Sequence, residues 1–279
     1  GVVACVSIIT FGVISLRNEQ TQQFQRIVDE VVAHIENAFV DYKSAGLWVH
    51  SACLDRNISR TGFQELYEHV IADGLQVMGA NMIYNVTDGE RAAYEEEARD
   101  FYAEFYPDIV YRGFVGMEPN KTSETGYSVQ PRSRQPFYYV VHLIAPVEEN
   151  ARAADFDLWS SETRRATIQT ALDTWQPALT ERLVVVQETE GTYSVVLMHP
   201  GVPLSTRPNA TTRDVSNVVI RIPDLLDRAT SSITYPVSVY LHDSTYDSSE
   251  TDDFLGGVMI GGNLSKIFVP EVELSTLRS

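Results

Sequence analysis

The sequence is poor in cysteine and in basic residues. Its 279 residues include two cysteines, Cys5 and Cys53, which are too few for a disulfide framework and lack zinc-ligand spacing. Lysine and arginine number 21 against 38 aspartate and glutamate residues, so the formal net charge is −17. Proteins that bind nucleic acids or anionic lipid headgroups need basic surfaces. The composition therefore disfavours a nucleic-acid partner and is typical of a globular chain with an acidic surface.

Catalytic motifs are missing as well. The sequence has no G-x-S-x-G, H-E-x-x-H or C-x-x-C motif and no P-loop lysine. Its six histidines are scattered singly, and His142, in the strongest strand pattern, is expected to be half-buried and hydrogen-bonded. We therefore predict no catalytic residue, no metal site and no cofactor, and we do not expect this region to be an enzyme.

The first residues form an uncharged apolar run. Residues 2–16 are shorter than the roughly 20 residues that span a bilayer. They lack the basic start and cleavage site of a signal peptide. We expect residues 1–16 to be a truncated transmembrane helix, with a signal-peptide core or an ordinary buried helix as alternatives.

Residues 17–56 carry a heptad pattern. Apolar side chains alternate steps of four and three over about four heptads. The members of this seam are Phe24, Val28, Val31, Ile35, Ala38, Tyr42, Ala45, Val49 and Ala52. The pattern predicts a stalk helix that pairs with a second copy, as a parallel homodimer, along Phe24, Val28, Val31 and Ile35. A long helix packed on its own domain fits the same pattern equally well.

The remaining chain mixes short helical and strand patterns without regular alternation. Residues 137–144 form the strongest strand pattern, residues 161–174 form a helical one, and residues 118–136 are polar enough for a long loop. The proline-rich span 200–214 is the best linker candidate. We therefore expect an α+β chain, with a larger unit at 57–204 and a smaller unit at 213–279.

Five sequons of the form N-x-S/T are an excess among so few asparagines. They begin at Asn57, Asn85, Asn120, Asn209 and Asn263. Glycosylation at these sequons would place the chain on the extracellular or lumenal side of a membrane. We expect their side chains to be exposed.

Several segments, in the right order, resemble the CHASE family of extracellular sensory domains. Residues 59–102 look like the family's Arg-x-x-Phe-Glu start, first strand and later Arg-x-x-Tyr/Phe helix. Residues 137–188 are similar to its strand ending in Glu-Pro, its Gly-Phe-Asp-x-x-Ser motif and the Arg that opens a helix. Residues 195–204 and 219–229 resemble its Pro-Val strand end and its Asp-Leu-Leu helix. The resemblance covers roughly residues 55–245.

The resemblance implies a stalk helix and two PAS-like units, of which the membrane-distal one, 57–204, holds a ligand pocket. Such domains lie outside the cell between two membrane helices and control a cytoplasmic histidine kinase or nucleotide cyclase, often as dimers. The alternatives are a secreted or surface interaction protein without signalling output, and a secreted hydrolase whose site residues lie far apart in the sequence.

The resemblance also points to ligand residues. In plant members, a carboxylate at the start of the central strand receives the adenine ring of a cytokinin. Phe137 stands at that position here, so the ligand is an unidentified small molecule or peptide. The candidate ligand contacts are Phe137, Tyr139, Val141, Phe156, Leu158 and Thr180.

Two further positions depart from the family pattern. Ala145 replaces the Glu before Pro146, and Asp155 replaces the Gly before Phe156. We expect Asp157 and Arg164, seven residues apart, to tie the following turn together rather than to contact ligand.

Overall fold

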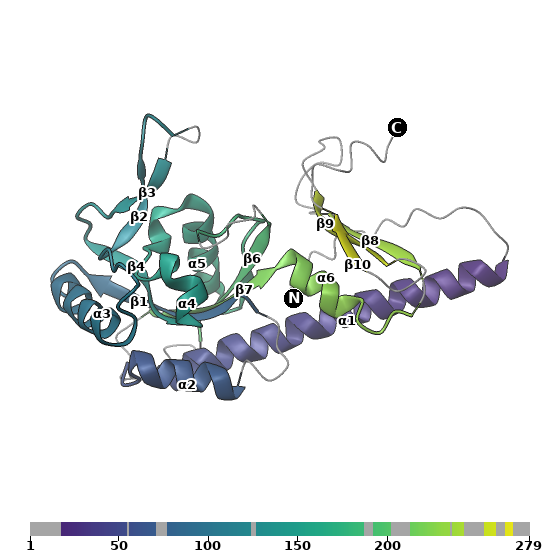
Figure 1. Cartoon of the computed structure of the whole chain (residues 1–279), viewed down its shortest axis with the longest axis horizontal. Helices are drawn as coiled ribbons and strands as arrows, with labels where there is room; N and C mark the ends of the chain where they lie inside the picture. The colour runs from purple at the N-terminus through teal and green to yellow at the C-terminus, as the bar shows by residue number, and fades with distance from the viewer. Residues whose placement is uncertain are drawn as a thin grey trace. The chain divides into compact units, whose positions relative to one another are not determined.

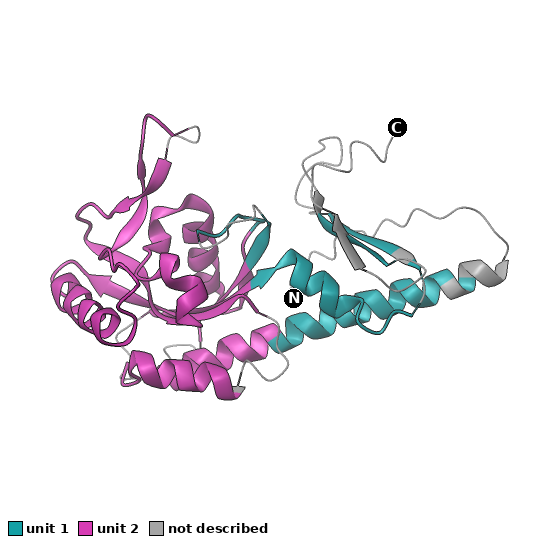
Figure 2. Cartoon of the chain, viewed as in Figure 1, with its two compact units in different colours: residues 1–41, 181–195, 220–279 teal, residues 42–180, 196–219 magenta. Residues whose placement is uncertain are grey.

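The computed structural model describes residues 18–54, 56–70, 77–123, 127–186, 192–201, 213–234, 236–242, 254–260 and 266–269. The chain forms two compact units (Figure 2): residues 1–41, 181–195 and 220–279 make unit 1, and residues 42–180 and 196–219 make unit 2. The segment 2–16, expected to be a membrane helix, lies outside the described residues. Among those that are described, no helix is both long and apolar enough to cross a bilayer.

The predicted N-terminal helix is present as α1, Asn18–Ala52 (Figure 1). Its apolar seam is covered by the chain itself, because Val31 and Ala38 in unit 1 and Tyr42 and Val49 in unit 2 are fully buried. The structure therefore favours the interpretation in which this face packs on its own domain. Pairing with a second copy stays a prediction. Val31 is not accessible for it, whereas the other three predicted dimer residues, Phe24, Val28 and Ile35, are half-buried.

Unit 2 is built on most of a five-stranded sheet of order β4-β1-β7-β6-β5. Its strands are β1 (Gly79–Thr87), β4 (Phe137–Ala145), β5 (Ala178–Leu179), β6 (Ser194–His199) and β7 (Val215–Arg221). The central strand β1 pairs antiparallel with β4 on one side and with β7 on the other. Because β1 is covered on both faces, its apolar residues and asparagines are nearly all buried.

Helices cover both faces of this sheet (Figure 1). The helices and remaining strands of unit 2 are α2 (Arg60–Val70), α3 (Arg91–Phe105), β2 (Val115–Pro119), β3 (Tyr127–Pro131), α4 (Val147–Asn150), η1 (Ala151–Ala153), η2 (Leu158–Ser160) and α5 (Glu162–Thr174). The end of α1 and α2 lie on one face, whereas α4 and α5 lie on the other. The polar stretch expected to be a loop instead forms the antiparallel hairpin β2–β3.

Unit 1 contains the first part of α1 and the end of the chain. Its further elements are α6 (Ile222–Ala229), β8 (Val237–His242), β9 (Phe254–Ile260) and β10 (Lys266–Val269). The three strands form an antiparallel sheet with β9 in the middle. Arg228 at the end of α6 forms an ion pair with Asp41 of α1, and the Ser232 hydroxyl donates to Glu30 at 2.7 Å. These contacts hold α6 and the segment that follows it to α1 within unit 1.

The fold confirms the α+β class, a long helix followed by antiparallel sheets, but it moves the expected boundary between units. Residues 200–214 were expected to separate them. Instead, β6 before this span and β7 after it lie in the same sheet, and Asn217 of β7 pairs with Asn81 of β1. The boundary is wrong because a strand pairing between segments 136 residues apart leaves no local signal in the sequence.

Three of the five sequons fall on described residues. Asn57 is exposed, whereas Asn85 and Asn120 are half-buried. The Asn120 amide donates to Ser128 at 2.9 Å, and the Asn85 side chain is hydrogen-bonded to Tyr139 inside the sheet. Glycosylation stays a prediction, and the geometry favours Asn57. Asn209 and Asn263 lie outside the described residues.

The end of α1 approaches the sheet of unit 2 closely because glycines leave room. The Ser216 hydroxyl donates to the Gly46 carbonyl at 2.6 Å. Gly201 has a positive φ of 74°, and a Cβ there would lie 2.1 Å from the His50 ring. The neighbouring His199 is buried, and its Nδ1 accepts from the Gly201 amide at 2.9 Å. Helix and sheet are therefore joined through two buried histidines.

This packing predicts a loss of stability in acid. Burial lowers the pKa of His199 from 6.5 to about 4. Between these values the unfolded chain binds a proton that the folded chain does not, so the free energy of unfolding falls as the pH falls. The loss from this group is up to ~1.4 kcal/mol per pH unit. We expect urea unfolding at pH 7 and pH 4.5 to show that the free energy of unfolding falls less between these two pH values in His199→Gln than in the wild type. The exposed His69→Gln serves as control, and equal losses in wild type and His199→Gln would contradict the assignment.

Candidate ligand-binding site

The predicted ligand residues of β4 lie on the face of the sheet that α4 and α5 cover. Phe137, Tyr139 and Val141 alternate along β4, and Tyr139 pairs with Asn85 of β1. Tyr139 and Val141 are 3% and 2% exposed, whereas Phe137 is half-buried. The structure therefore places all three side chains on one face, as the strand periodicity predicted.

An aromatic cluster forms at the start of this face. The Trp159 ring of η2 stacks on Tyr139 with ring centroids 4.9 Å apart, and Phe137 meets both rings edge-on. Burial raises the pKa of the Tyr139 hydroxyl, although its hydrogen bond with Asn85 acts in the opposite direction. Tyr139 is therefore neutral. Trp159 was not among the ligand residues predicted from the sequence, although an aromatic residue directly after the predicted Leu158 could have indicated that it belongs to the site.

Asp157 fixes the segment that carries η2 against β4. Its carboxylate accepts from the Tyr139 and Trp159 amides at 2.9 and 3.1 Å and from Arg132 Nε at 2.7 Å. Asp157 therefore ties the turn, as predicted, but its cationic partner is Arg132. Arg164 contacts the same turn through the Ser161 hydroxyl at 3.3 Å, and no carboxylate of the described chain is within ion-pairing distance of it.

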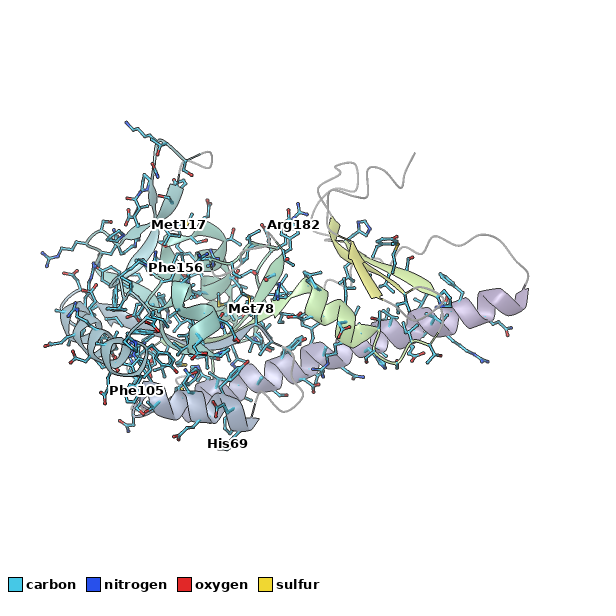
Figure 3. The ribbon with its side chains drawn as sticks, viewed as in Figure 1. His69, Met78, Phe105, Met117, Phe156 and Arg182 are labelled. Carbon is cyan, nitrogen blue, oxygen red and sulfur yellow. The ribbon has the colours of Figure 1, made fainter. Side chains whose placement is uncertain are left out.

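The remaining predicted residues have different roles. Phe156 and Leu158 are buried beside β4, and the Phe156 carbonyl accepts from the Val141 amide at 3.1 Å. Phe156 lies beside α5 in the interior of unit 2 (Figure 3). Thr180 is also buried, but its hydroxyl oxygen accepts from the Val196 amide at 2.9 Å. Thr180 thus supports strand pairing next to β6.

Buried asparagines add polar groups to the same face. Asn81 is 3% exposed, and its amide donates to Asn217 at 2.6 Å across β1 and β7. Asn81 Oδ1 is buried with no hydrogen-bond partner among the described residues. Asn81 and Asn85 are four residues apart, so they share a face of β1. That spacing was a signal in the sequence, and it was missed.

The other face of β4 carries a cluster of charged side chains that pair with one another. Buried Arg60 pairs with Glu97 at 3.0 Å and donates to His142 Nδ1 at 2.9 Å. Burial and the nearby guanidinium lower the pKa of His142, so the ring is neutral. As predicted, His142 is hydrogen-bonded, but it is more deeply buried than expected. This cluster joins α2, α3 and β4 and is structural.

Asp155 completes the cluster from a backbone position that favours glycine. Its φ is 49°, which explains why the resembling family has Gly there. The carboxylate is fully buried, 3.6 Å from Arg60 and 2.5 Å from the Tyr111 hydroxyl. Burial raises its pKa, but Arg60 and His142 outweigh this effect and hold the pKa below its usual value.

Arg164, in the first turn of α5, borders the site. It donates to the Ser161 hydroxyl at 3.3 Å, and its guanidinium carbon lies 5.5 Å from the centre of the Phe156 ring. Among the described residues, no group of three or more histidine, cysteine, aspartate or glutamate side chains could hold a metal ion. The site is thus an aromatic and amide-lined face beside Arg164, which has no carboxylate partner in the described part of the chain.

Comparisons with known proteins identify the family of the chain. No curated protein is significantly similar to the chain. Among solved structures, it is similar to the extracellular domain of mmHK1S-Z3, a predicted histidine kinase, at 12% identity and a TM-score of 0.42, covering 81% of this chain and 69% of that one. The sequence model of the CHASE domain matches residues 56–253. The chain therefore belongs to the CHASE domain family, the sensory domains of signalling receptors.

Proposed function

We propose that unit 2 binds a small-molecule or peptide ligand on the α5-facing side of β4 and β1, and that binding controls a cytoplasmic histidine kinase or nucleotide cyclase. The observation that carries this proposal is the composition of that face. It combines the Tyr139–Trp159 stack with the buried asparagines Asn81 and Asn217. Ligand sites are mostly apolar with a few fixed polar groups.

The polar groups on the two faces of β4 differ, and this difference supports placing the ligand on the α5-facing side. On the α2 side, the charges of Arg60, Glu97, Asp155 and His142 are paired with one another, although Asp155 Oδ1 and the Tyr84 and Tyr102 hydroxyls are buried without a hydrogen-bond partner among the described residues. On the α5 side, Asn81 Oδ1 is buried without a partner in the described chain. Leaving a buried polar atom unpaired costs about 1–3 kcal/mol. A ligand that donates a hydrogen bond there would recover this cost, and together with the Tyr139–Trp159 stack this favours the α5 side as the binding face.

The route to the membrane in this proposal is α1. This helix contributes residues to both units, and in unit 2 it is held to the sheet through Gly46 and His50. A ligand changes output only if it binds one arrangement of the receptor better than another. We propose that residues 2–16, outside the described part of the chain, anchor α1 in the membrane with unit 2 on the extracellular side.

A ligand screen tests the sensing function. Thermal unfolding of the protein with a library of small metabolites and short peptides should give hits that raise the melting temperature, since a ligand at about 100 times its Kd adds ~2.7 kcal/mol. Trp159→Ala should weaken hits at least roughly tenfold, because an aromatic contact contributes about 1–3 kcal/mol. Phe105→Ala, at the end of α3 and 51% exposed (Figure 3), should leave them unchanged.

The screen also separates the alternatives. A secreted assembly protein without signalling output predicts that no small molecule or peptide stabilises the chain. Absence of any hit, or an equal effect of Phe105→Ala and Trp159→Ala, would contradict the proposal.

We also propose that the receptor forms a parallel homodimer along α1. Since Val31 is covered, the contact would use side chains beside the buried seam. Leu47 and Trp48 of α1 are 40% and 41% exposed, which is high for large apolar residues on a helix. Leu47→Glu with Trp48→Glu should weaken self-association in analytical ultracentrifugation. Val110→Glu, at an 82% exposed position outside α1, is the control. A chain that is monomeric at the highest accessible concentration would rule the dimer out.

A further inference from the structure

We infer that the ligand of unit 2 is an organic anion and that Arg164 receives its negative group. This inference rests on the proposed ligand-binding function and names the chemical class of the ligand. It starts from a contrast between Arg164 and the other inward-facing arginines of the same unit.

Each of those arginines has a carboxylate partner. The pairs are Arg56–Asp214 at 2.5 Å, Arg60–Glu97 at 3.0 Å, Arg91–Glu95 at 2.8 Å and Arg132–Asp157 at 2.7 Å. Within the described chain, Arg164 has only the neutral Ser161 hydroxyl and the Phe156 ring. Among the residues that the structure describes, unit 2 thus supplies a carboxylate to four arginines and none to Arg164.

Arg164 is half-buried, on the inward-facing side of α5. In a helix, residues three, four, seven and eight positions apart share a face. The residues at those distances from Arg164 are Thr167, Ile168, Ala171 and Leu172, and all four are buried. The Phe156 ring under the guanidinium is 1% exposed and belongs to the segment that borders Val141. Arg164 therefore lies where α5 meets the proposed binding face.

The position is electrostatically unfavourable for a cation in the absence of ligand. Partial burial lowers the pKa of Arg164 to about 10, and no carboxylate among the described residues offsets the effect. The first turn of a helix also has a partial positive charge and free amide groups, which repel cations and attract anions. The N-cap residue, Ser161, leaves these amides uncapped by its side chain. An anionic group of the ligand would be stabilised by both the guanidinium and the helix terminus.

The surroundings indicate an anion with an apolar body. Phe156, Val141 and Tyr139 are apolar or aromatic, and the ring of Trp159 is stacked nearby. A carboxylic acid with an aromatic or aliphatic body would use both parts of this site. Inorganic anions would use only Arg164 and the helix terminus.

The first test needs no ligand. Arg164→Met keeps much of the side-chain volume and removes the unpaired charge, so the melting temperature of the ligand-free protein should rise by about 2–4 °C. Arg132→Met removes the partner of buried Asp157 and should lower it, whereas exposed Arg165→Met should leave it unchanged. If Arg164→Met destabilises the protein as Arg132→Met does, Arg164 is a structural residue and the inference is wrong.

The second test compares organic carboxylic acids with their neutral amides by thermal shift and calorimetry. The acids should bind, and the amides and acetate or phosphate alone should not. Arg164→Met should weaken binding roughly 10- to 100-fold, the loss expected for a charged hydrogen bond, and Arg165→Met should not change it. Binding of amides as tightly as acids, or unchanged affinity in Arg164→Met, would overturn the inference and leave the sensing function standing. Failure of both acids and amides to bind would contradict both.

Discussion

The site depends on one buried carboxylate, that of Asp157. It accepts from two backbone amides and from Arg132, and its own amide donates to Val115 at 2.7 Å. Through these bonds it joins β4, η2 and the β2–β3 hairpin. Burial raises its pKa, while Arg132 and the amides act in the opposite direction. Because α5 begins five residues later, Asp157 also sets where Arg164 and the first turn of α5 stand.

This arrangement gives β4 two different faces. Towards α2 and α3, charges are paired within the chain, and the cluster around Arg60 holds helices to the sheet. Towards α5, aromatic rings and asparagines line the sheet, with an unpaired guanidinium beside them. On the first face the described charges are paired, although three buried polar atoms have no hydrogen-bond partner among the described residues. The second contains polar groups whose burial is costly until something binds them.

Local patterns predicted the elements that position the site. Periodicity in the sequence predicted the strand β4, the helix α5 and the shared face of Phe137, Tyr139 and Val141. The resemblance to the family indicated that this face contacts the ligand. Long-range features could not be read in this way. The pairing of β7 with β1, the covering of Val31 by its own chain and the choice of Arg132 as the partner of Asp157 all join distant segments. Asp155 shows a further limit of prediction from sequence. The family pattern has Gly at this position, and only the positive φ of Asp155 in the structure reveals why.

Hydrogen exchange, measured with and without a ligand from the screen, tests the central claim that unit 2 binds its ligand between α5 and the β4 face. The account predicts slower exchange of amides in β4 and in residues 156–168, which form the two sides of the proposed site. Slower exchange confined to α6, β8 and β9 of unit 1, with β4 and α5 unchanged, would contradict it.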